Sequence, residues 1–234
     1  MPEVPPSSPR TSALSPFYEP STDRGKPMNK IRIGLLGGTF DPVHNGHLHV
    51  ARHMRRKLSL DQVHLVTAYK PPHKVSGVLG AEHRHEMVQA ACASEEGLFA
   101  SAIELEQGFS FTIDTVRYLR TNHPAGADNL ELYFITSAEY VDPNNPHNLL
   151  TWMDARELFS LVKFVVTPRG GTDVAGTQAW VDSLGLTDVA MVEDVPPLHV
   201  TSGVVKRALA GGQSVDAMLP ARVAELIRAR GYYR

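Results

Sequence analysis

Residues 31–47 read IRIGLLGGTFDPVHNGH, and this stretch decides the fold class. Four apolar side chains in residues 31–36 form a short run that is typical of a buried strand, and Gly37-Gly38 closes it. A helical pattern then runs from about Gly46 to Leu58, with Leu48 and Ala51 on its apolar side. A buried strand that passes through a glycine-rich turn into an amphipathic helix is the first unit of an α/β sheet.

The rest of the chain repeats the same alternation. The sequence predicts strands at 63–69, 99–103, 130–135, 161–167 and 189–192, and helices at 81–93, 112–119, 154–159 and 178–184. Two more helices close the chain, one from about Ser202 and one over 220–230, with Pro220 in its first turn. Strands separated by helices predict a doubly wound parallel sheet with right-handed crossovers, formed by one domain over 29–234.

Residues 1–28 have a different composition. They are rich in Pro and Ser and poor in large apolar side chains. Such a segment cannot bury enough apolar surface to offset the entropy of ordering it, so we predict a disordered tail.

The bulk properties exclude several classes of protein. The 234 residues carry a formal charge of −2, and 42% are hydrophobic. A nearly neutral chain gives no electrostatic reason to expect nucleic acid or a membrane as partner. No apolar run approaches the roughly 20 residues of a membrane span, the first residues form no secretory signal, and the single cysteine, Cys92, permits no internal disulfide. These features predict a cytoplasmic protein, and they leave self-association into a homo-oligomer open.

The distinctive chemical feature is a pair of histidines, His44 and His47, where the first helix begins. A spacing of three places both imidazoles on one side of the first turn. The helix N-terminus adds exposed N–H groups and partial positive charge, and Gly37, Gly38 and Gly46 allow close approach of the backbone. The pattern favours a phosphate-binding site. The alternatives are two solvated surface histidines, or half of a zinc site, for which the spacing offers no further ligands.

Other common sites are missing from the sequence. Residues 37–47 match neither a GxGxxG fingerprint nor a phosphate loop ending in Gly-Lys-Ser/Thr. We find no serine–histidine–acid or cysteine–histidine pattern, and Cys92 lies in an apolar stretch typical of core packing. The pattern therefore favours chemistry by positioning and charge neutralisation.

Residues 37–47 resemble the HxGH signature of the nucleotidyltransferase α/β-phosphodiesterase superfamily. In the form GG[ST]FDPxHxGHL they are most similar to nicotinate-nucleotide adenylyltransferases. The resemblance implies a Rossmann-like nucleotidyltransferase fold that transfers AMP from ATP, with Mg²⁺, to nicotinate mononucleotide, giving deamido-NAD and pyrophosphate. It implies that His44 and His47 contact the phosphates, that Thr39 lies near the transferred α-phosphate, and that further ATP contacts come from Gly37, Gly38, Phe40 and Gly46.

Three further segments resemble the same family and imply a site for a pyridine mononucleotide. Residues 71–74, PPHK, correspond to a family segment whose lysine, here Lys74, approaches the nucleotides. Residues 108–115 are similar to GxSYTxDT, which assigns Ser110 and Thr112 to the acceptor, with Thr112 near the pyridine carboxylate. Trp152 matches a tryptophan that stacks on the pyridine ring, and Arg84 with Met87 matches an RxxM helix.

Two segments depart from the family pattern. Ser137-Ala138-Glu139 stands where the family has Gly-Ala-Asp. The family's ISSTxIR corresponds to residues 200–206, where Thr201 and Ser202 can still cap a phosphate-facing helix and Lys206 replaces arginine as a catalytic charge without its bidentate fork. This ending also resembles pantetheine-phosphate adenylyltransferases.

The departures keep other functions open. The acceptor could be nicotinamide mononucleotide or 4′-phosphopantetheine, with the reaction unchanged. A non-catalytic nucleotide-binding homologue of the same fold is the alternative from another class, and it would bind ATP without releasing pyrophosphate.

Overall fold

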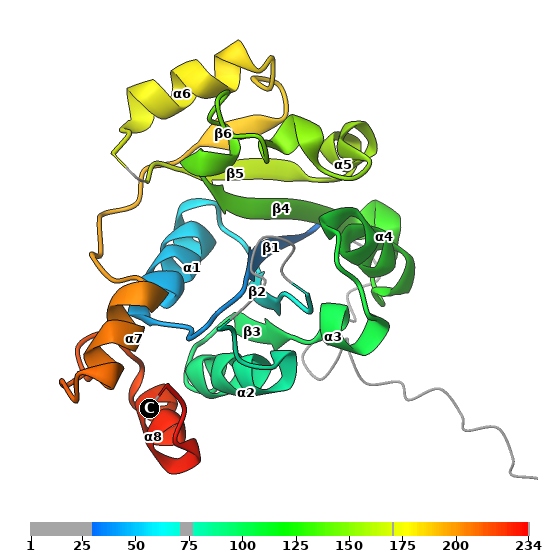
Figure 1. The fold of residues 1–234 in the computed structure, drawn as a ribbon. Helices are drawn as coiled ribbons and strands as arrows, with labels where there is room; N and C mark the ends of the chain where they lie inside the picture. The colour runs from blue at the N-terminus through cyan, green and yellow to red at the C-terminus, as the bar shows by residue number, and fades with distance from the viewer. Residues whose placement is uncertain (1–29, 71–76, 170, 234) are drawn as a thin grey trace, which may run out of the picture.

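The structure is a computed structural model, and it describes residues 30–70, 77–169 and 171–233. In these residues, six parallel strands form one sheet. Their order across the sheet is β3-β2-β1-β4-β5-β6, and Figure 1 shows them in this succession from bottom to top. The strands are β1 (Ile31–Gly38), β2 (Gln62–Thr67), β3 (Leu98–Ser101), β4 (Leu130–Ser137), β5 (Lys163–Thr167) and β6 (Ala190–Val192). The predicted doubly wound parallel sheet is confirmed.

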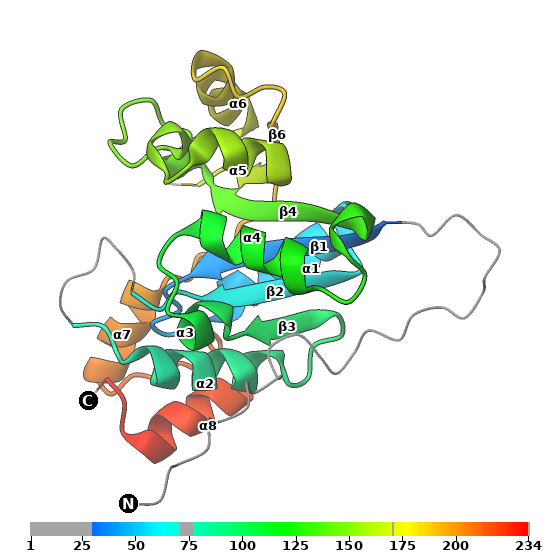
Figure 2. The same ribbon diagram turned by 90° about the vertical axis from the view of Figure 1, so that its right-hand side faces the viewer.

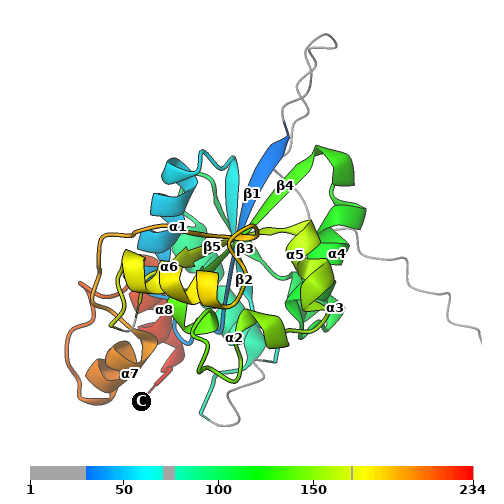
Figure 3. The same ribbon diagram turned by 90° about the horizontal axis from the view of Figure 1, so that it is seen from above.

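Helices connect the strands and cover both faces of the sheet; seen from above, α1 lies on one side and α4 and α5 on the other (Figure 3). The helices are α1 (Asn45–Lys57), α2 (Ala81–Cys92), α3 (Ile103–Gln107), α4 (Thr112–Asn122), α5 (Ala155–Leu161), α6 (Val174–Ser183), α7 (Ser202–Ala210) and α8 (Ala221–Arg230). Short 3₁₀ turns are η1 (Ala127–Asn129), η2 (Ala138–Tyr140) and η3 (Leu149–Thr151). No helix within the described ranges has the length and apolar character to cross a membrane.

The apolar run of β1 is buried on both faces of the sheet. Leu36 packs into a cluster with the buried side of α1, whereas Ile33 and Leu35 pack into a second cluster with α4. A central parallel strand therefore needs apolar residues at successive positions, which is the pattern that the sequence shows.

The sheet order reverses at β1. Its neighbours are β2 on one side and β4 on the other, with Leu36 aligned to Leu65 and to Ile135. The chain that follows β1 continues into α1 on one face of the sheet, and the chain that follows β4 continues into α5 on the other face (Figure 3). A crevice therefore opens between them at the carboxyl ends of the two strands. The β1–α1 loop and the first turn of α1, which carry His44 and His47, border this crevice.

The last helix, α8, packs beside α2 at the β3 end of the molecule (Figure 2). Arg230 pairs with Glu86 of α2 at 2.7 Å, and the Tyr232 hydroxyl lies 2.8 Å from Nδ1 of His83. These contacts join the end of the described chain to its first half.

Several element boundaries differ from the sequence prediction. Ile103 begins the five-residue helix α3, so the strand predicted over 99–103 is too long, and Leu161 ends α5, so β5 starts at Lys163. Pro220 precedes α8 as its N-cap. Short apolar runs do not separate strand from helix by periodicity, which explains the first two errors. The tail predicted for 1–28 lies outside the described residues.

Candidate active site

The loop between β1 and α1 packs closely against Gly38 at the end of β1 and Gly46 in the first turn of α1. A Cβ atom on Gly38 would lie 2.8 Å from the ring of Phe40, and one on Gly46 would lie 3.0 Å from the His44 imidazole. Side chains at these two positions would push the loop away from the strand end. Phe40 itself is buried and has a φ of 50°.

His44 and His47 lie together, as the spacing predicts. Their rings stack with centroids 3.7 Å apart and an interplanar angle of 23°. The backbone N–H of His44 donates to Nδ1 of His47 at 3.2 Å, so a neutral His47 ring carries its proton on Nε2. Phe40 packs edge-on against His47 at 4.9 Å. The pair is therefore held in one orientation by the end of the loop and the first turn of α1.

The charge of His44 depends on its surroundings. Its side chain is buried, and this burial, with a smaller contribution from the positive charge of Arg169, lowers the pKa of His44 to about 4. The imidazole is thus neutral at pH 7 in the protein alone. A phosphate beside the ring would shift the pKa upward, so we expect the cationic donor only in the presence of nucleotide.

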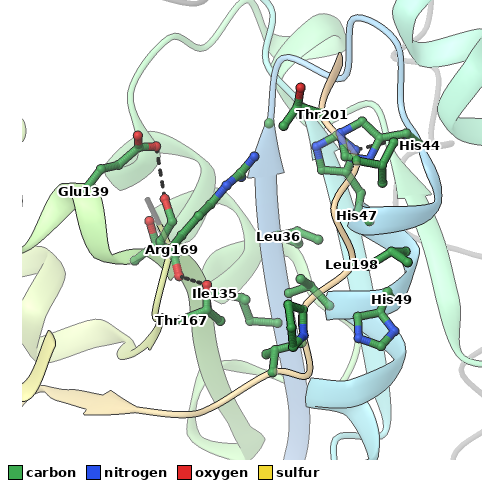
Figure 4. A pocket seen from close by; sticks show the side chains of 18 of the residues that line it. Leu36, His44, His47, His49, Ile135, Glu139, Thr167, Arg169, Leu198 and Thr201 are labelled. Atoms are coloured by element: carbon green, nitrogen blue, oxygen red, sulfur yellow. Dashed lines mark hydrogen bonds between the residues drawn. The ribbon is translucent and has the colours of Figure 1, made fainter. Parts of the chain in front are cut away.

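A cavity of about 760 Å³ opens beside the two histidines (Figure 4). We call it the donor cavity. It is lined by all the residues predicted to contact ATP and by three of the four predicted as catalytic: Gly37, Gly38, Thr39, Phe40, His44, Gly46, His47, Thr201 and Ser202. Residues from both ends of the described sequence therefore meet in one concave surface.

The N-terminus of α7 lies beside the two histidines and contributes to the lining of the donor cavity (Figure 4). Thr201 is its N-cap, and its hydroxyl oxygen accepts a hydrogen bond from the Val204 N–H at 3.2 Å. The Ser202 hydroxyl donates to the carbonyl of Pro42 at 2.9 Å, which fastens the helix to the β1–α1 loop. The predicted cap is confirmed, and the partial positive charge of the helix end adjoins the donor cavity.

Arg169 is a cationic residue of this cavity that the sequence prediction missed. It follows β5 in the run Thr167-Pro168-Arg169, and its side chain extends toward the carboxyl end of β1 in Figure 4. A basic residue directly after a strand at the same sheet edge was the available signal. A guanidinium here suits the phosphate oxygens of a nucleotide.

A second cavity, of about 460 Å³, lies on the other side of the strand end. We call it the acceptor cavity. Ser110, Thr112 and Trp152, the described residues assigned to the acceptor, all line it, together with Phe111. Lys74 was assigned to the same role and lies outside the described residues.

Trp152 is held in an aromatic cluster at the wall of the acceptor cavity. Its ring meets Phe134 at 5.6 Å and Tyr140 at 5.4 Å, both nearly perpendicular. Its Nε1–H donates to the carbonyl of His147 at 3.2 Å. Trp152 therefore both packs against the sheet and presents part of its ring to the cavity, which suits a flat aromatic ligand.

The two cavities share a wall. The residues common to both linings come from the end of β1 and from β4 and the turn after it: Gly37, Gly38, Thr39, Thr136, Glu139 and Tyr140. Two molecules bound in the two cavities would meet over Thr39, so the geometry suits transfer of a group between neighbouring ligands.

Lys206 lines neither cavity. Its ammonium pairs with the buried carboxylate of Asp41, which also accepts a hydrogen bond from the Tyr233 hydroxyl at 2.7 Å. The structure therefore does not bring Lys206 beside the histidines as it does the other predicted catalytic residues. Its catalytic role stays a prediction, and its visible contact holds the β1–α1 loop through Asp41.

The substituted segment after β4 forms an internal contact. The Ser137 hydroxyl donates to the Glu139 carboxylate at 3.0 Å, and Glu139 lines both cavities. The longer carboxylate is thus turned back toward the added hydroxyl.

Arg84 is a buried residue that holds the backbone of the site in place through hydrogen bonds. It is 1% exposed, and its guanidinium donates to the carbonyls of Thr39 at 2.6 Å, Ala68 at 2.7 Å, Leu79 at 2.9 Å and Tyr69 at 3.2 Å. The sequence identified Arg84 only through the RxxM resemblance. The structure shows that it ties Thr39 to the end of β2.

A parallel sheet with a paired-histidine loop at its switch point defines a nucleotide-binding α/β transferase. The chain belongs to the cytidylyltransferase-like family, whose model matches residues 35–208. A Streptococcus pyogenes serotype M3 protein named "Probable nicotinate-nucleotide adenylyltransferase" is 34% identical, over 94% of this chain and 98% of its own. A protein of the same name from Clavibacter michiganensis is also 34% identical, over 88% and 95%. The chain is thus a homologue of the nicotinate-nucleotide adenylyltransferases.

Solved structures share the fold. Plasmodium falciparum nicotinic acid mononucleotide adenylyltransferase complexed with NaAD superposes with a TM-score of 0.66 at 17% identity, covering 86% of this chain and 97% of that one. The same protein complexed with APC gives a TM-score of 0.66 at 16% identity, covering 88% and 98%. At this identity the likeness supports the Rossmann-like nucleotidyltransferase fold.

Proposed function

We propose that this protein transfers AMP from ATP to nicotinate mononucleotide, giving deamido-NAD and pyrophosphate. The observation that carries the proposal is the pair of cavities that meet over Thr39, with the stacked histidines beside the larger one. Full-length homologues carry the corresponding name.

The reaction requires positioning more than covalent participation by the protein. A phosphate oxygen of the acceptor forms a bond to the α-phosphorus of ATP, and the bond between this phosphorus and the bridging α–β oxygen breaks. The acceptor phosphate is already anionic near neutral pH, so no protein base has to create the nucleophile. The protein holds the two phosphates in line and stabilises the charge that develops on departing pyrophosphate.

Each part of the site has a place in this reaction. His44, His47 and Arg169 line the donor cavity with the N-terminus of α7, and these groups would neutralise the phosphates. Thr39 lies at the shared wall, where the α-phosphate would be transferred. Trp152 and Thr112 would orient the pyridine ring in the acceptor cavity.

Mg²⁺ is expected to accompany ATP. No group of three His, Cys, Asp or Glu residues suited to a metal occurs in the described ranges. Mg²⁺ in nucleotide-binding proteins is commonly held by the phosphates of the nucleotide and by water, with few protein ligands, and we expect the same arrangement here. When bound, the ion would neutralise phosphate charge. The cytoplasmic location and any homo-oligomer remain predictions from sequence.

Pyrophosphate release tests the proposal. Purified protein with ATP and Mg²⁺ is offered nicotinate mononucleotide, nicotinamide mononucleotide or 4′-phosphopantetheine at equal concentration. We expect the highest turnover with nicotinate mononucleotide. Turnover no higher than with phosphopantetheine would reject the pyridine assignment, and ATP binding without pyrophosphate release from any acceptor would indicate a non-catalytic nucleotide-binding homologue.

A further inference from the structure

Glu104 places a carboxyl group in the wall of the acceptor cavity. It belongs to α3, the short helix absent from the sequence prediction. One carboxyl oxygen accepts a hydrogen bond from the Tyr69 N–H and the other from the Thr115 hydroxyl, both at 3.3 Å. Neither donor is charged.

No ion pair joins Glu104 to a cation within the described ranges. Arg84 is close enough to act on it electrostatically, but its guanidinium donates its hydrogen bonds to backbone carbonyls. Among the described residues, Glu104 is therefore a shielded carboxyl group with no hydrogen-bonded cationic partner, in the wall of the proposed acceptor cavity.

The surroundings of Glu104 bring the titration of its carboxyl group close to pH 7. Burial raises its pKa to about 7, against smaller downward effects from the Tyr69 N–H, the Thr115 hydroxyl and the Arg84 charge. Other titratable side chains also face this cavity: Glu139 and Tyr140 of η2, and His147 of the following loop. Glu139 adds negative charge to the same space, so it does not assist ionisation of Glu104.

We propose that Glu104 makes binding of the acceptor's ring carboxylate depend on a proton. The cavity accepts a negatively charged ring substituent when Glu104 is protonated and disfavours it when Glu104 is ionised, because two carboxylates would then share a shielded space. An uncharged carboxamide meets no such repulsion. The inference rests on the proposed function and adds to it a residue that determines acceptor specificity.

The size of the effect follows from the protonated fraction. For a group that titrates near pH 7, this fraction falls from about nine-tenths at pH 6 to about one-tenth at pH 8. If only the protonated form binds nicotinate mononucleotide well, its apparent binding constant weakens by about tenfold over this range. The phosphate of nicotinamide mononucleotide titrates in the same way as that of the acid, so the ratio of the two constants isolates the ring carboxylate.

The experiment measures KM for nicotinate mononucleotide and Ki for nicotinamide mononucleotide between pH 6 and 8. The variants are Glu104→Gln, which cannot ionise, and Glu106→Gln, an exposed neighbour on α3 as matched control. We expect the ratio of KM to Ki to rise about tenfold in the wild type and in Glu106→Gln, and to stay constant in Glu104→Gln. The same rise in a folded Glu104→Gln, or a constant ratio in the wild type, would overturn the proposal.

Calorimetry of the wild type tests, without a variant, whether Glu104 takes up a proton when nicotinate mononucleotide binds. At pH 7, binding of nicotinate mononucleotide should take up about half a proton more than binding of the amide, measured in buffers of different ionisation enthalpy. Equal uptake for the two ligands would reject the role of Glu104. The proposed function fails differently, through absence of pyrophosphate release with nicotinate mononucleotide at every pH.

Discussion

His47 combines a fixed orientation with a position at the donor cavity. We predict that His47→Ala lowers turnover at least a hundredfold, because one preorganised donor to the departing charge typically contributes about that much. Steady-state pyrophosphate release measures it. His53→Ala, on the same helix α1 but absent from both cavity linings, is the control and should keep wild-type turnover. Near-normal turnover of His47→Ala would remove His47 from the mechanism.

Burial of His44 has a consequence for stability in acid. Its pKa in the folded protein is about 4, below the ordinary 6.5, so between these values the unfolded chain binds a proton that the folded protein does not. Above pH 6.5 neither state binds this proton, and the free energy of unfolding does not depend on the protonation of His44. As the pH falls from 6.5 toward 4, proton binding by the unfolded chain lowers the free energy of unfolding by about 1.4 kcal/mol per pH unit. Urea unfolding at pH 7, 6 and 5 should show a shallower loss in His44→Asn than in the wild type. Equal slopes would contradict the assignment.

Some residues of the candidate site could be predicted from the sequence and others could not. His44 and His47 were found because a local spacing at a glycine-rich turn carries the information. Arg169 depends on the order of strands in the sheet, which brings the end of β5 to the end of β1 through β4. The contact of Lys206 with Asp41 joins residues 165 positions apart and leaves no local pattern.

At the scale of elements, α7 is attached to the β1–α1 loop by two contacts, Ser202 with Pro42 and Lys206 with Asp41. We predict that Lys206→Met lowers the free energy of unfolding by about 1.5–3 kcal/mol, the usual contribution of a hydrogen bond to a charged group, because Asp41 stays buried and loses a partner. Chemical denaturation measures the change. Arg207→Met, exposed on the same helix, should change stability by less than about 0.5 kcal/mol.

The kinetics of the same variant test the catalytic assignment of Lys206. If Lys206 acts through Asp41, Lys206→Arg should restore stability and turnover together. If Lys206 also contacts the phosphates directly, turnover of Lys206→Met should fall by more than its loss of stability explains, when turnover is measured where the variant is fully folded.

The strands and long helices were predictable because their apolar spacing reflects burial against the sheet. The short helix α3 was not, because five residues carry too little periodicity and Ile103 fits a strand equally well. Missing α3 also concealed Glu104, whose position in the acceptor cavity follows from the turn that this helix makes after β3.

At the scale of the whole molecule, the shared wall makes one prediction about ligands. A dinucleotide product would fill both cavities, so deamido-NAD should displace both a non-hydrolysable ATP analogue and nicotinate mononucleotide in equilibrium competition. AMP, which fits the donor cavity alone, should displace the ATP analogue and leave the pyridine ligand bound. Simultaneous binding of deamido-NAD and either substrate would show that the cavities act independently.

The donor cavity also has a consequence for how the protein is made. Its lining combines residues between 36 and 50 with residues 195–203, and these two segments leave the ribosome far apart in time. The donor cavity therefore lacks part of its lining until translation has passed Thr201. Enzyme activity should therefore emerge abruptly near the end of synthesis.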